Sequence, residues 1–481
     1  MGEKKNYFKA FIDFVASKRF FYVVIGLFLF QAMWIGLSNN YGSPHDEKYH
    51  VGVIQIYSHQ LTPFMNGQPT SYDQFGDISR NSSYLYHYLM SFPYRLISSI
   101  TGDLKIQVLF LRSFNILFVV LALLIFKKIL DELFKKPIIS NLSLFAVVMT
   151  PVVTYVSEGV NYDNLVFLGF AVSLYLTIKL LKKFRFTTAL LWLSVNILTV
   201  LVKFSYGPIA LVLVAGTVVY YFVNKIKIIP EIKHSLKNTK RIKMVLLILL
   251  SVVAMGLFVE RYVGNIVAYG TPMPDCAKVL NAERCSNWAA WERNVVLQQK
   301  HLTKKRVSFA SYSLNWVKTM ESSSFGIYRT SSVKKALPII KFAGYFVLGL
   351  FLLLTVLNIK YIFKRPVLLI TLGSIVLYTL ALFYVNYRDY RLLASPVAIQ
   401  GRYLILIMPL MMGFGLFFVH KILEQYKKLW LAFVIFLILI FLQGGVVTYI
   451  VSSDHAWWWP DKTVVNINES AKNVLKPVVF K

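Results

Sequence analysis

Long apolar stretches, separated by shorter polar segments, run through the chain from residue 20 to residue 451. About 20 mainly apolar residues are needed for a helix to cross the hydrocarbon core of a bilayer. The pattern predicts about eleven such helices; several are short, and the fifth and sixth have almost no connector between them. They lie near residues 20–38, 104–126, 141–157, 164–181, 187–203, 206–223, 244–260, 337–358, 367–386, 403–419 and 429–451. The predicted fold class is therefore all-α, a polytopic integral membrane protein.

The polar segments divide the chain further. Residues 1–19 place apolar side chains among lysines, as an interfacial amphipathic helix does. A transmembrane domain then covers 20–451, with two helical extracytoplasmic loops at 39–103 and 261–336, and a tail follows at 452–481. Trp457, Trp458 and Trp459 follow the last predicted span, which is typical of an interfacial aromatic belt.

Composition excludes a soluble globular protein. Only 15% of the 481 residues are charged and 57% are hydrophobic, whereas soluble proteins carry about 25% charged residues. The Lys-rich, Ile-rich and Cys-poor composition indicates a bacterial protein, so the predicted location is the bacterial plasma membrane.

The net charge of +30 is distributed as a membrane protein requires. If odd-numbered spans run from inside to outside, the cytoplasmic segments hold 25 Lys or Arg residues and six acidic residues, and the outer turn 158–163 holds no Lys or Arg. This is the positive-inside pattern, and it predicts a cytoplasmic N-terminus. Because the basic residues are scattered over short loops, nucleic acid is not an expected partner.

The only two cysteines, Cys276 and Cys285, lie in the second outer loop. Outside the membrane a disulfide that closes this small loop is plausible. Two free thiols fit the sequence equally well, so the pairing stays open.

The first outer loop begins with a pair of adjacent acids, Asp46 and Glu47, after Pro44 and before His50. One interpretation is structural, since acids in the first turn of a helix are stabilised by the helix dipole. A zinc protease is excluded by spacing, because His45 and His50 are five residues apart and the protease motif needs four. The other interpretation is chemical: a carboxylate here would accept a proton from an attacking hydroxyl.

A second acidic group lies in the turn between the third and fourth spans, where Glu158 and Asp163 face the same predicted outer side as Asp46. The turn could simply keep two span ends polar. Its carboxylates could also position an acceptor or hold a divalent cation, Mg²⁺ or Mn²⁺, through oxygen ligands. The identity of any metal is not predicted.

Cations accompany these acids. Arg112 lies several residues inside the second span, where a charge is costly and usually faces a partner or a cavity. Lys203 ends the fifth span, and Arg402 precedes the tenth beside Gln400 and Tyr403. An arginine fork suits a phosphate or pyrophosphate, although Lys203 and Arg402 could also be interfacial anchors.

Taken in order, these motifs resemble those of the GT-C superfamily of integral membrane glycosyltransferases. More narrowly, the chain is similar to a bacterial polytopic family with a P-D-E-x-x-H start and a Q-G-R-Y near its end. The segment 44–50 matches the first pattern with His45 inserted after the proline, and 400–403 matches the second without change. Leu111-Arg112-Ser113 and Asn161-Tyr162-Asp163 resemble two further elements of the family, so the resemblance extends over most of 20–420.

The resemblance implies an inverting transferase at the outer membrane face. Its donor would be a polyprenyl-phosphate-linked sugar, and its acceptor a cell-surface glycan or glycolipid. By this analogy Asp46 is the general base, supported by Glu47 and His50, while Glu158 or Asp163 positions the acceptor or a metal. Cations would neutralise the departing lipid phosphate, namely Arg402 and Lys203, with Arg112, Gln400 and Tyr403 as further candidates.

Two other functions fit part of the pattern. A transporter or flippase of lipid-linked sugars would carry ionisable groups near the midplane and often internal repeats, whereas Arg112 is the one clear deep charge in the sequence. A glycan polymerase or ligase would also use outer arginines. The sequence does not identify the sugar, the acceptor or the oligomeric state.

Overall fold

The structure is a computed structural model that describes residues 2–42, 46–65, 67–300, 306–329, 332–333 and 337–479. Pro44 and His45 of the first motif lie outside the described residues. Within them the protein is helical apart from one hairpin, in which β1 (Tyr328–Arg329) pairs antiparallel with β2 (Ser332–Val333). The predicted all-helical class is confirmed for the described chain.

Eight helical segments in the described chain are long and apolar enough to cross a membrane. They are α2 (Lys18–Ser38), α5 (Leu104–Phe134), α8 (Tyr162–Lys182), η2 with α10 (Phe204–Tyr206, Gly207–Val223), α12 with η3 and α13 (Arg241–Phe258, Val259–Val263, Gly264–Tyr269), α18 (Pro338–Leu357), α20 (Pro366–Leu393), and α22 with α23 (Lys427–Phe441, Gly445–Ser452). The protein is therefore a multi-pass membrane protein.

The other three predicted spans are apolar helices of a different kind. The third consists of α6 (Pro137–Met149) and α7 (Pro151–Ser157), which meet at an angle of 69°. The fifth and tenth are the shorter helices α9 (Phe186–Val202) and α21 (Met408–Leu423). Every predicted stretch is thus helical, but the structure supports eight spans, or nine if the bent pair counts as one, and the number eleven stays a prediction.

The bend between α6 and α7 has a simple cause. Pro151 begins α7 and has no backbone N–H to continue the hydrogen bonds of α6, and its ring clashes with the preceding turn. Proline also stands in the first turn of α6, α18 and α20, where a missing N–H costs nothing. The local sequence therefore determines where these helices begin.

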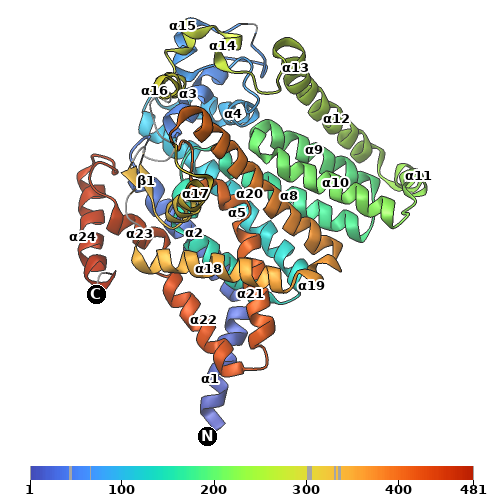
Figure 1. The fold of residues 1–481 in the computed structure, drawn as a ribbon, viewed down its shortest axis with the longest axis vertical. Helices are drawn as coiled ribbons and strands as arrows, with labels where there is room; N and C mark the ends of the chain where they lie inside the picture. Colours follow the sequence, from blue (N-terminus) through green and yellow to red (C-terminus); the bar gives the residue numbers. More distant parts are fainter. Residues whose placement is uncertain are drawn as a thin grey trace.

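Helix α6 lies at the centre of the bundle. All of its residues from Ile138 to Met149 are buried, as expected for a helix that is apolar on every side. It packs against α2, α5, α21 and α22, while α5 packs against α8, and α8 against α9. Figure 1 shows α12 on one flank of this bundle. Only 11% of the most apolar 18-residue stretch of the segment Arg241–Tyr269 is buried within the protein.

The two large loops, which the sequence predicts to be extracytoplasmic, fold into compact, mutually packed segments. The first contains α3 (Glu47–Ser58), η1 (Thr70–Phe75) and α4 (Leu85–Ile100); the second contains α14 (Cys276–Val279), α15 (Ala282–Cys285), α16 (Ala289–Lys300) and α17 (Phe309–Ser324). The seventh span continues to Tyr269, beyond its predicted end at residue 260, so the second loop begins later than expected. The remaining elements are α1 (Gly2–Ala16), α11 (Ile228–Asn238), α19 (Ile359–Phe363), η4 (Gly401–Leu406) and α24 (Lys462–Val479).

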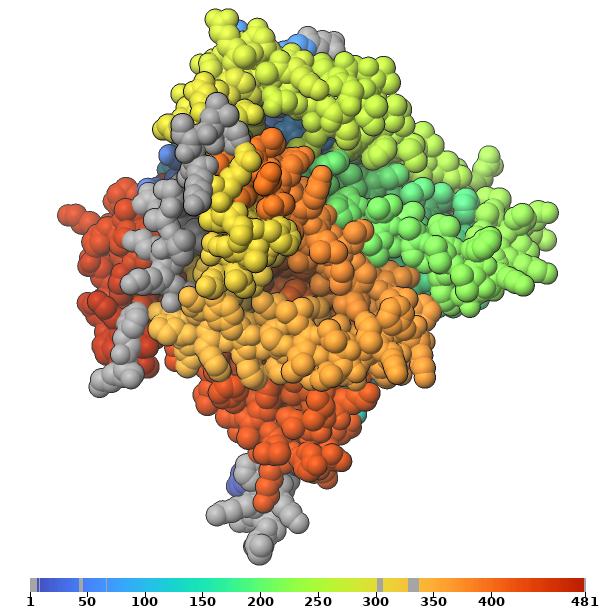
Figure 2. Space-filling view, viewed as in Figure 1, coloured from blue at the N-terminus to red at the C-terminus, as the bar shows by residue number. Residues whose placement is uncertain are grey.

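Figure 1 places α1 at one end of the molecule and α14 and α15 at the opposite end. In the space-filling view, residues of the second loop and of the end of the seventh span cover that opposite end (Figure 2). Arg261, near the end of the seventh span, joins that span to the first loop, because its Nη1 donates to the carbonyl oxygens of Ser79 at 2.9 Å and Asn81 at 3.0 Å.

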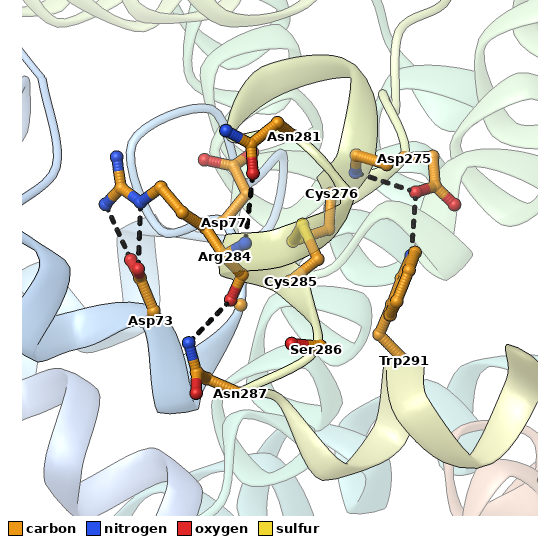
Figure 3. The surroundings of a disulfide bond; sticks show 12 residues. Asp73, Asp77, Asp275, Cys276, Asn281, Arg284, Cys285, Ser286, Asn287 and Trp291 are labelled. Carbon is orange, nitrogen blue, oxygen red and sulfur yellow. Dashed lines mark hydrogen bonds and ion pairs between the residues drawn. A yellow bond between two sulfur atoms is a disulfide. The ribbon is translucent and has the colours of Figure 1, made fainter.

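A disulfide also shapes this end. Cys276 and Cys285 are bonded to each other, which resolves the pairing that the sequence left open. The bond holds the short helix that carries Arg284, and Arg284 donates to Asp73 of the first loop at 2.6 and 2.8 Å (Figure 3). Trp288 packs against Gly76, where an added Cβ would lie 2.5 Å from the indole ring.

The tryptophan run after the last span does not form the expected interfacial belt. Trp457 and Trp458 are each 1% exposed and pack with Tyr155 and Tyr449. The run pairs with the end of α2: the amide of Asn40 donates to the carbonyl of Trp457, and the amide of Trp459 to the carbonyl of Ser38. The start of the tail is therefore part of the folded core at the C-terminal end of α2.

Candidate functional site

Adjacent residues at the start of α3 point in different directions. Asp46 is the N-cap residue, its side chain makes no capping hydrogen bond, and it is 55% exposed. Glu47 is the first helical residue and is fully buried. Asp46 precedes the helix with a left-handed backbone conformation (φ 58°), so its side chain leaves the chain in a different direction from that of Glu47, and the two carboxylates enter different networks.

Glu47 belongs to a buried network with Arg112. The guanidinium donates to both carboxylate oxygens, from Nε to Oε1 at 2.8 Å and from Nη2 to Oε2 at 2.7 Å. The backbone amides of Gly42 and Val160 also donate to Glu47, at 3.0 and 3.1 Å. Nη1 of Arg112 donates to the carbonyl oxygens of Gly36 and Asn39, at 2.6 and 2.8 Å. This network joins α2, α3, α5 and the 158–163 turn.

Glu158 lies on the same network. Its Oε2 is 3.5 Å from Nε of Arg112, and its Oε1 accepts a hydrogen bond from Asn39 at 2.6 Å. Asn39 in turn accepts from the hydroxyl of Tyr449 at 2.9 Å. Burial raises the pKa of Glu158 to about 8, although Arg112 opposes this rise.

Asp46 belongs to a second cluster, which we call the paired-charge cluster: Asp46, Asp163, Lys203 and Arg402. Nη2 of Arg402 donates to Oδ2 of Asp46 at 2.5 Å, and its Nε lies 3.9 Å from Oδ2 of Asp163. The ammonium of Lys203 donates to Oδ1 of Asp163. Two carboxylates and two cations thus meet where α8 and α3 begin, where α9 ends, and at η4.

Aromatic rings line the paired-charge cluster. Nζ of Lys203 lies 4.5 Å from the ring centre of Tyr162 and 4.6 Å from that of Tyr403. The backbone carbonyl of Tyr403 accepts a hydrogen bond from Tyr378 at 2.9 Å. The two aromatic rings stabilise the ammonium through cation–π interactions, which do not use its N–H donors. Lys203 can therefore donate further hydrogen bonds besides the one to Asp163.

The burial of Arg402 is the unusual feature of this cluster. The side chain is only 3% exposed, yet within the described structure Nε and Nη1 are buried and have no hydrogen-bond partner. Gln400, two residues earlier, has a buried Oε1 that is also unpartnered there. Leaving a charged donor unpaired costs free energy. Nε and Nη1 of Arg402 therefore mark a place where a ligand that accepts hydrogen bonds would be stabilised.

His50 lies beside the cluster, one helical turn after Asp46. Its backbone amide donates to the carbonyl of Asp46 at 3.0 Å, and its Nδ1 is 2.9 Å from Nε2 of His87. The ring of His50 meets Tyr162 edge to face at 4.6 Å. Burial holds the pKa of His50 well below its usual value.

The ten sequence-predicted residues therefore divide into two groups. The structure brings together Asp46, Asp163, Lys203 and Arg402, with His50 and Tyr403 beside them, while Gln400 precedes Arg402 by two residues in the chain. It places Glu47, Arg112 and Glu158 in the buried network, where Arg112 is occupied by Glu47 and backbone carbonyls. Tyr162 and His87 were not predicted as site residues; Tyr162 stands in the Asn161-Tyr162-Asp163 element, which could have indicated it, whereas no local signal indicates His87.

In the described residues, no group of three or more His, Cys, Asp or Glu side chains is arranged to hold a metal ion. Asp46 and Asp163 each pair with a cation instead. Participation of Mg²⁺ or Mn²⁺ stays a prediction.

The fold and the site define a multi-pass helical membrane protein with a cluster of paired charges at the end of the bundle that its two large loops cover. No protein-family model matches this chain, and no curated protein matches its sequence significantly.

Proposed function

We propose that the protein is a membrane glycosyltransferase of the GT-C type. It would move a sugar from a polyprenyl-phosphate donor to a cell-surface glycan or glycolipid acceptor, with inversion at the anomeric carbon. The reaction would take place at the extracytoplasmic face of the bacterial plasma membrane, with the N-terminus in the cytoplasm. The supporting observation is Arg402, a buried guanidinium with two unpartnered N–H groups, paired with the half-exposed carboxylate of Asp46.

The donor phosphate binds Arg402 and Lys203 in this proposal. A guanidinium offers two parallel N–H groups that fit two phosphate oxygens, and an ammonium adds a second positive charge. Phosphate competes with Asp46 for Arg402, so donor binding releases the Asp46 carboxylate from its ion pair. Donor binding thereby prepares the base.

The transfer step then balances as follows. The acceptor hydroxyl gives its proton to Asp46 while its oxygen forms a bond to the anomeric carbon. The bond between that carbon and the phosphate oxygen breaks, and its electron pair stays on the polyprenyl phosphate. Arg402 and Lys203 stabilise the negative charge that develops on this leaving group. Asp163 holds the two cations in place.

The buried network holds the elements of the paired-charge cluster in position. Glu47, Arg112 and Glu158 tie the start of α3 to α5 and to the 158–163 turn, and these elements carry Asp46 and Asp163. Glu47 is therefore a positioning residue in this proposal, although it stands beside the base in the sequence.

The test compares wild type with Asp46→Asn, purified with lipid and supplied with polyprenyl-phosphate sugars and a cell-surface glycan extract. We expect wild type to transfer sugar, and the variant to bind the donor lipid but transfer about 10²- to 10⁴-fold more slowly, the usual contribution of a general base. Asp389→Asn is the matched control, because Asp389 pairs with its neighbour Arg388 and not with the cluster.

Two results would contradict the proposal. If Asp46→Asn transfers sugar as fast as wild type, Asp46 is not the base. If wild type transfers nothing but moves the lipid-linked sugar across a vesicle membrane, the protein is a transporter. A product of many sugar units added at once would instead identify a polymerase or ligase.

A further inference from the structure

Two histidines from different helices form a buried pair next to the paired-charge cluster. His50 of α3 and His87 of α4 are each 1% exposed. Their rings are nearly parallel, with centroids 5.2 Å apart, and Nδ1 of His50 is 2.9 Å from Nε2 of His87. Only one of these two nitrogens can carry the shared proton when both rings are neutral.

The surroundings of His87 decide which nitrogen it is. Burial lowers the pKa of His87 to about 3, so this ring is neutral at physiological pH, and a hydrogen bond to the backbone carbonyl of Ser83 opposes the lowering. Because Nε2 of His87 faces His50, the N–H that reaches Ser83 is at Nδ1. Nε2 of His87 is then an acceptor, and Nδ1 of His50 must be the donor.

This assignment leaves Nε2 of His50 with a lone pair and no proton. In the described structure that nitrogen is buried and has no hydrogen-bond partner. His50 lies in the first turn of α3, and its backbone amide donates to the carbonyl of Asp46 at 3.0 Å. Its ring also touches Tyr162, which carries Lys203 on its face. An unsatisfied acceptor therefore lies at the wall of the cluster.

We propose that His87 is a positioning residue that keeps Nε2 of His50 unprotonated, and that this nitrogen accepts a hydrogen bond from a hydroxyl group of the acceptor sugar. The inference rests on the proposed function, since it assigns the hydroxyl to the glycan acceptor. No bond forms or breaks at His50, and the proton of the attacking hydroxyl still goes to Asp46.

The electrostatics suit a hydrogen-bond acceptor better than a base. The groups around His50 are Asp46 on its own helix, Tyr86 and His87 on α4, Tyr162 on α8, and the cations Arg402 and Lys203. Burial, with the two cations adding to it, lowers the pKa of His50. A weakly basic nitrogen orients a hydroxyl without removing its proton.

Two variants of His87 separate positioning from packing. In His87→Gln the amide oxygen extends about as far from the backbone as Nε2 of histidine does, so it can accept the hydrogen bond from His50. In His87→Leu a side chain of similar bulk offers no acceptor. Nitrogen-15 NMR of histidine-labelled protein in lipid reports the tautomer directly, and His50→Gln identifies the His50 signals by their loss.

We expect a protonated Nδ1 and a bare Nε2 on His50 in wild type and in His87→Gln, and a mixture of tautomers in His87→Leu. A protonated Nε2 in wild type would overturn the assignment. The same tautomer in all three proteins would overturn the positioning role of His87. This measurement needs no substrate.

Kinetics test the contact with the hydroxyl. The KM for the acceptor should rise about fivefold in His87→Leu, the size of one neutral hydrogen bond, with the donor KM unchanged and His87→Gln close to wild type. An equal loss in the Gln and Leu variants, or a rise in the donor KM instead, would overturn the contact. If wild type transfers no sugar, the hydroxyl assignment fails with the proposed function, while the nitrogen spectra still decide the tautomer.

Discussion

Arg402 and Asp46 stand 356 positions apart in the chain, and their side chains form a direct ion pair. Asp46 belongs to the first motif of the sequence and Arg402 to the last. Their contact joins the start of α3 to η4 and places an exposed carboxylate against a buried cation. This relationship is the basis for the first prediction.

Arg402→Gln should weaken binding of the polyprenyl-phosphate donor roughly 10- to 100-fold, because charge-assisted hydrogen bonds contribute about 1.5–3 kcal/mol. Arg402→Lys should recover part of the loss by restoring the charge without the fork. Donor binding is measured by titrating lipid-linked sugar into protein in nanodiscs. Arg388→Gln, which changes an exposed arginine, serves as the control; an unchanged donor affinity in Arg402→Gln would remove Arg402 from the phosphate site.

Arg112→Met should destabilise the protein by about 3–5 kcal/mol, because it leaves Glu47 and Glu158 buried without their cation. Replacing Glu47 by Leu in the same chain should recover part of this stability, since a buried ion pair can be exchanged for apolar groups at little cost. The measurement is the thermal unfolding midpoint in detergent. Asp46→Asn, at a half-exposed position, should leave that midpoint near the wild-type value.

The alternative for Glu47 is a direct catalytic role. Glu47→Gln protein that unfolds at the wild-type temperature, binds donor lipid and transfers no sugar would support that role and contradict the structural assignment made above.

Removing the disulfide should loosen the contact between the two large loops. In Cys276→Ser the loop that carries Arg284 loses a constraint worth about 3 kcal/mol for a ring of this size. Arg284 would then hold Asp73 less firmly, and amide hydrogen exchange should speed up across residues 67–78. Cys285→Ser should behave identically. Unchanged exchange in both variants would show that packing of Trp288 on Gly76 suffices to join the loops.

Acidification should destabilise the protein through the buried histidine pair. The folded-state pKa of His87 is about 3, against 6.5 for the exposed ring, so the unfolded chain binds an extra proton between these values. The neutral His87 ring therefore costs no stability above pH 6.5. As the pH falls to 5, the free energy of unfolding decreases by about 2 kcal/mol because of this one residue. His50 adds to the loss, because its pKa is also lowered.

Thermal unfolding of wild type and of His50→Gln/His87→Gln at pH 7.5 and pH 5 measures this dependence. The double variant should lose less stability than wild type over that interval. Equal losses would mean that other groups cause the acid sensitivity.

Much of the architecture is determined by the sequence alone. Each of the eleven apolar stretches is helical, since the cost of exposing backbone polar groups to lipid acts on every residue locally and leaves a local pattern. Prolines such as Pro137 and Pro366 indicate where helices begin for the same local reason. Asp46, Asp163 and Arg402 lie in the motifs of the sequence, and Lys203 ends a predicted span. The sequence alone therefore indicates these four residues, although it does not show their contacts.

Only the tertiary structure decided which of these charges meet. Asp46 and Glu47 are neighbours in the sequence, yet one joins Arg402 and the other Arg112, because the backbone is left-handed at Asp46 and becomes helical only at Glu47. The burial of Trp457 and Trp458 against the end of α2, and the pairing of His50 with His87, depend on which distant helix lies alongside. Hydropathy acts residue by residue, whereas the pairing of buried charges and rings depends on positions that the whole bundle establishes.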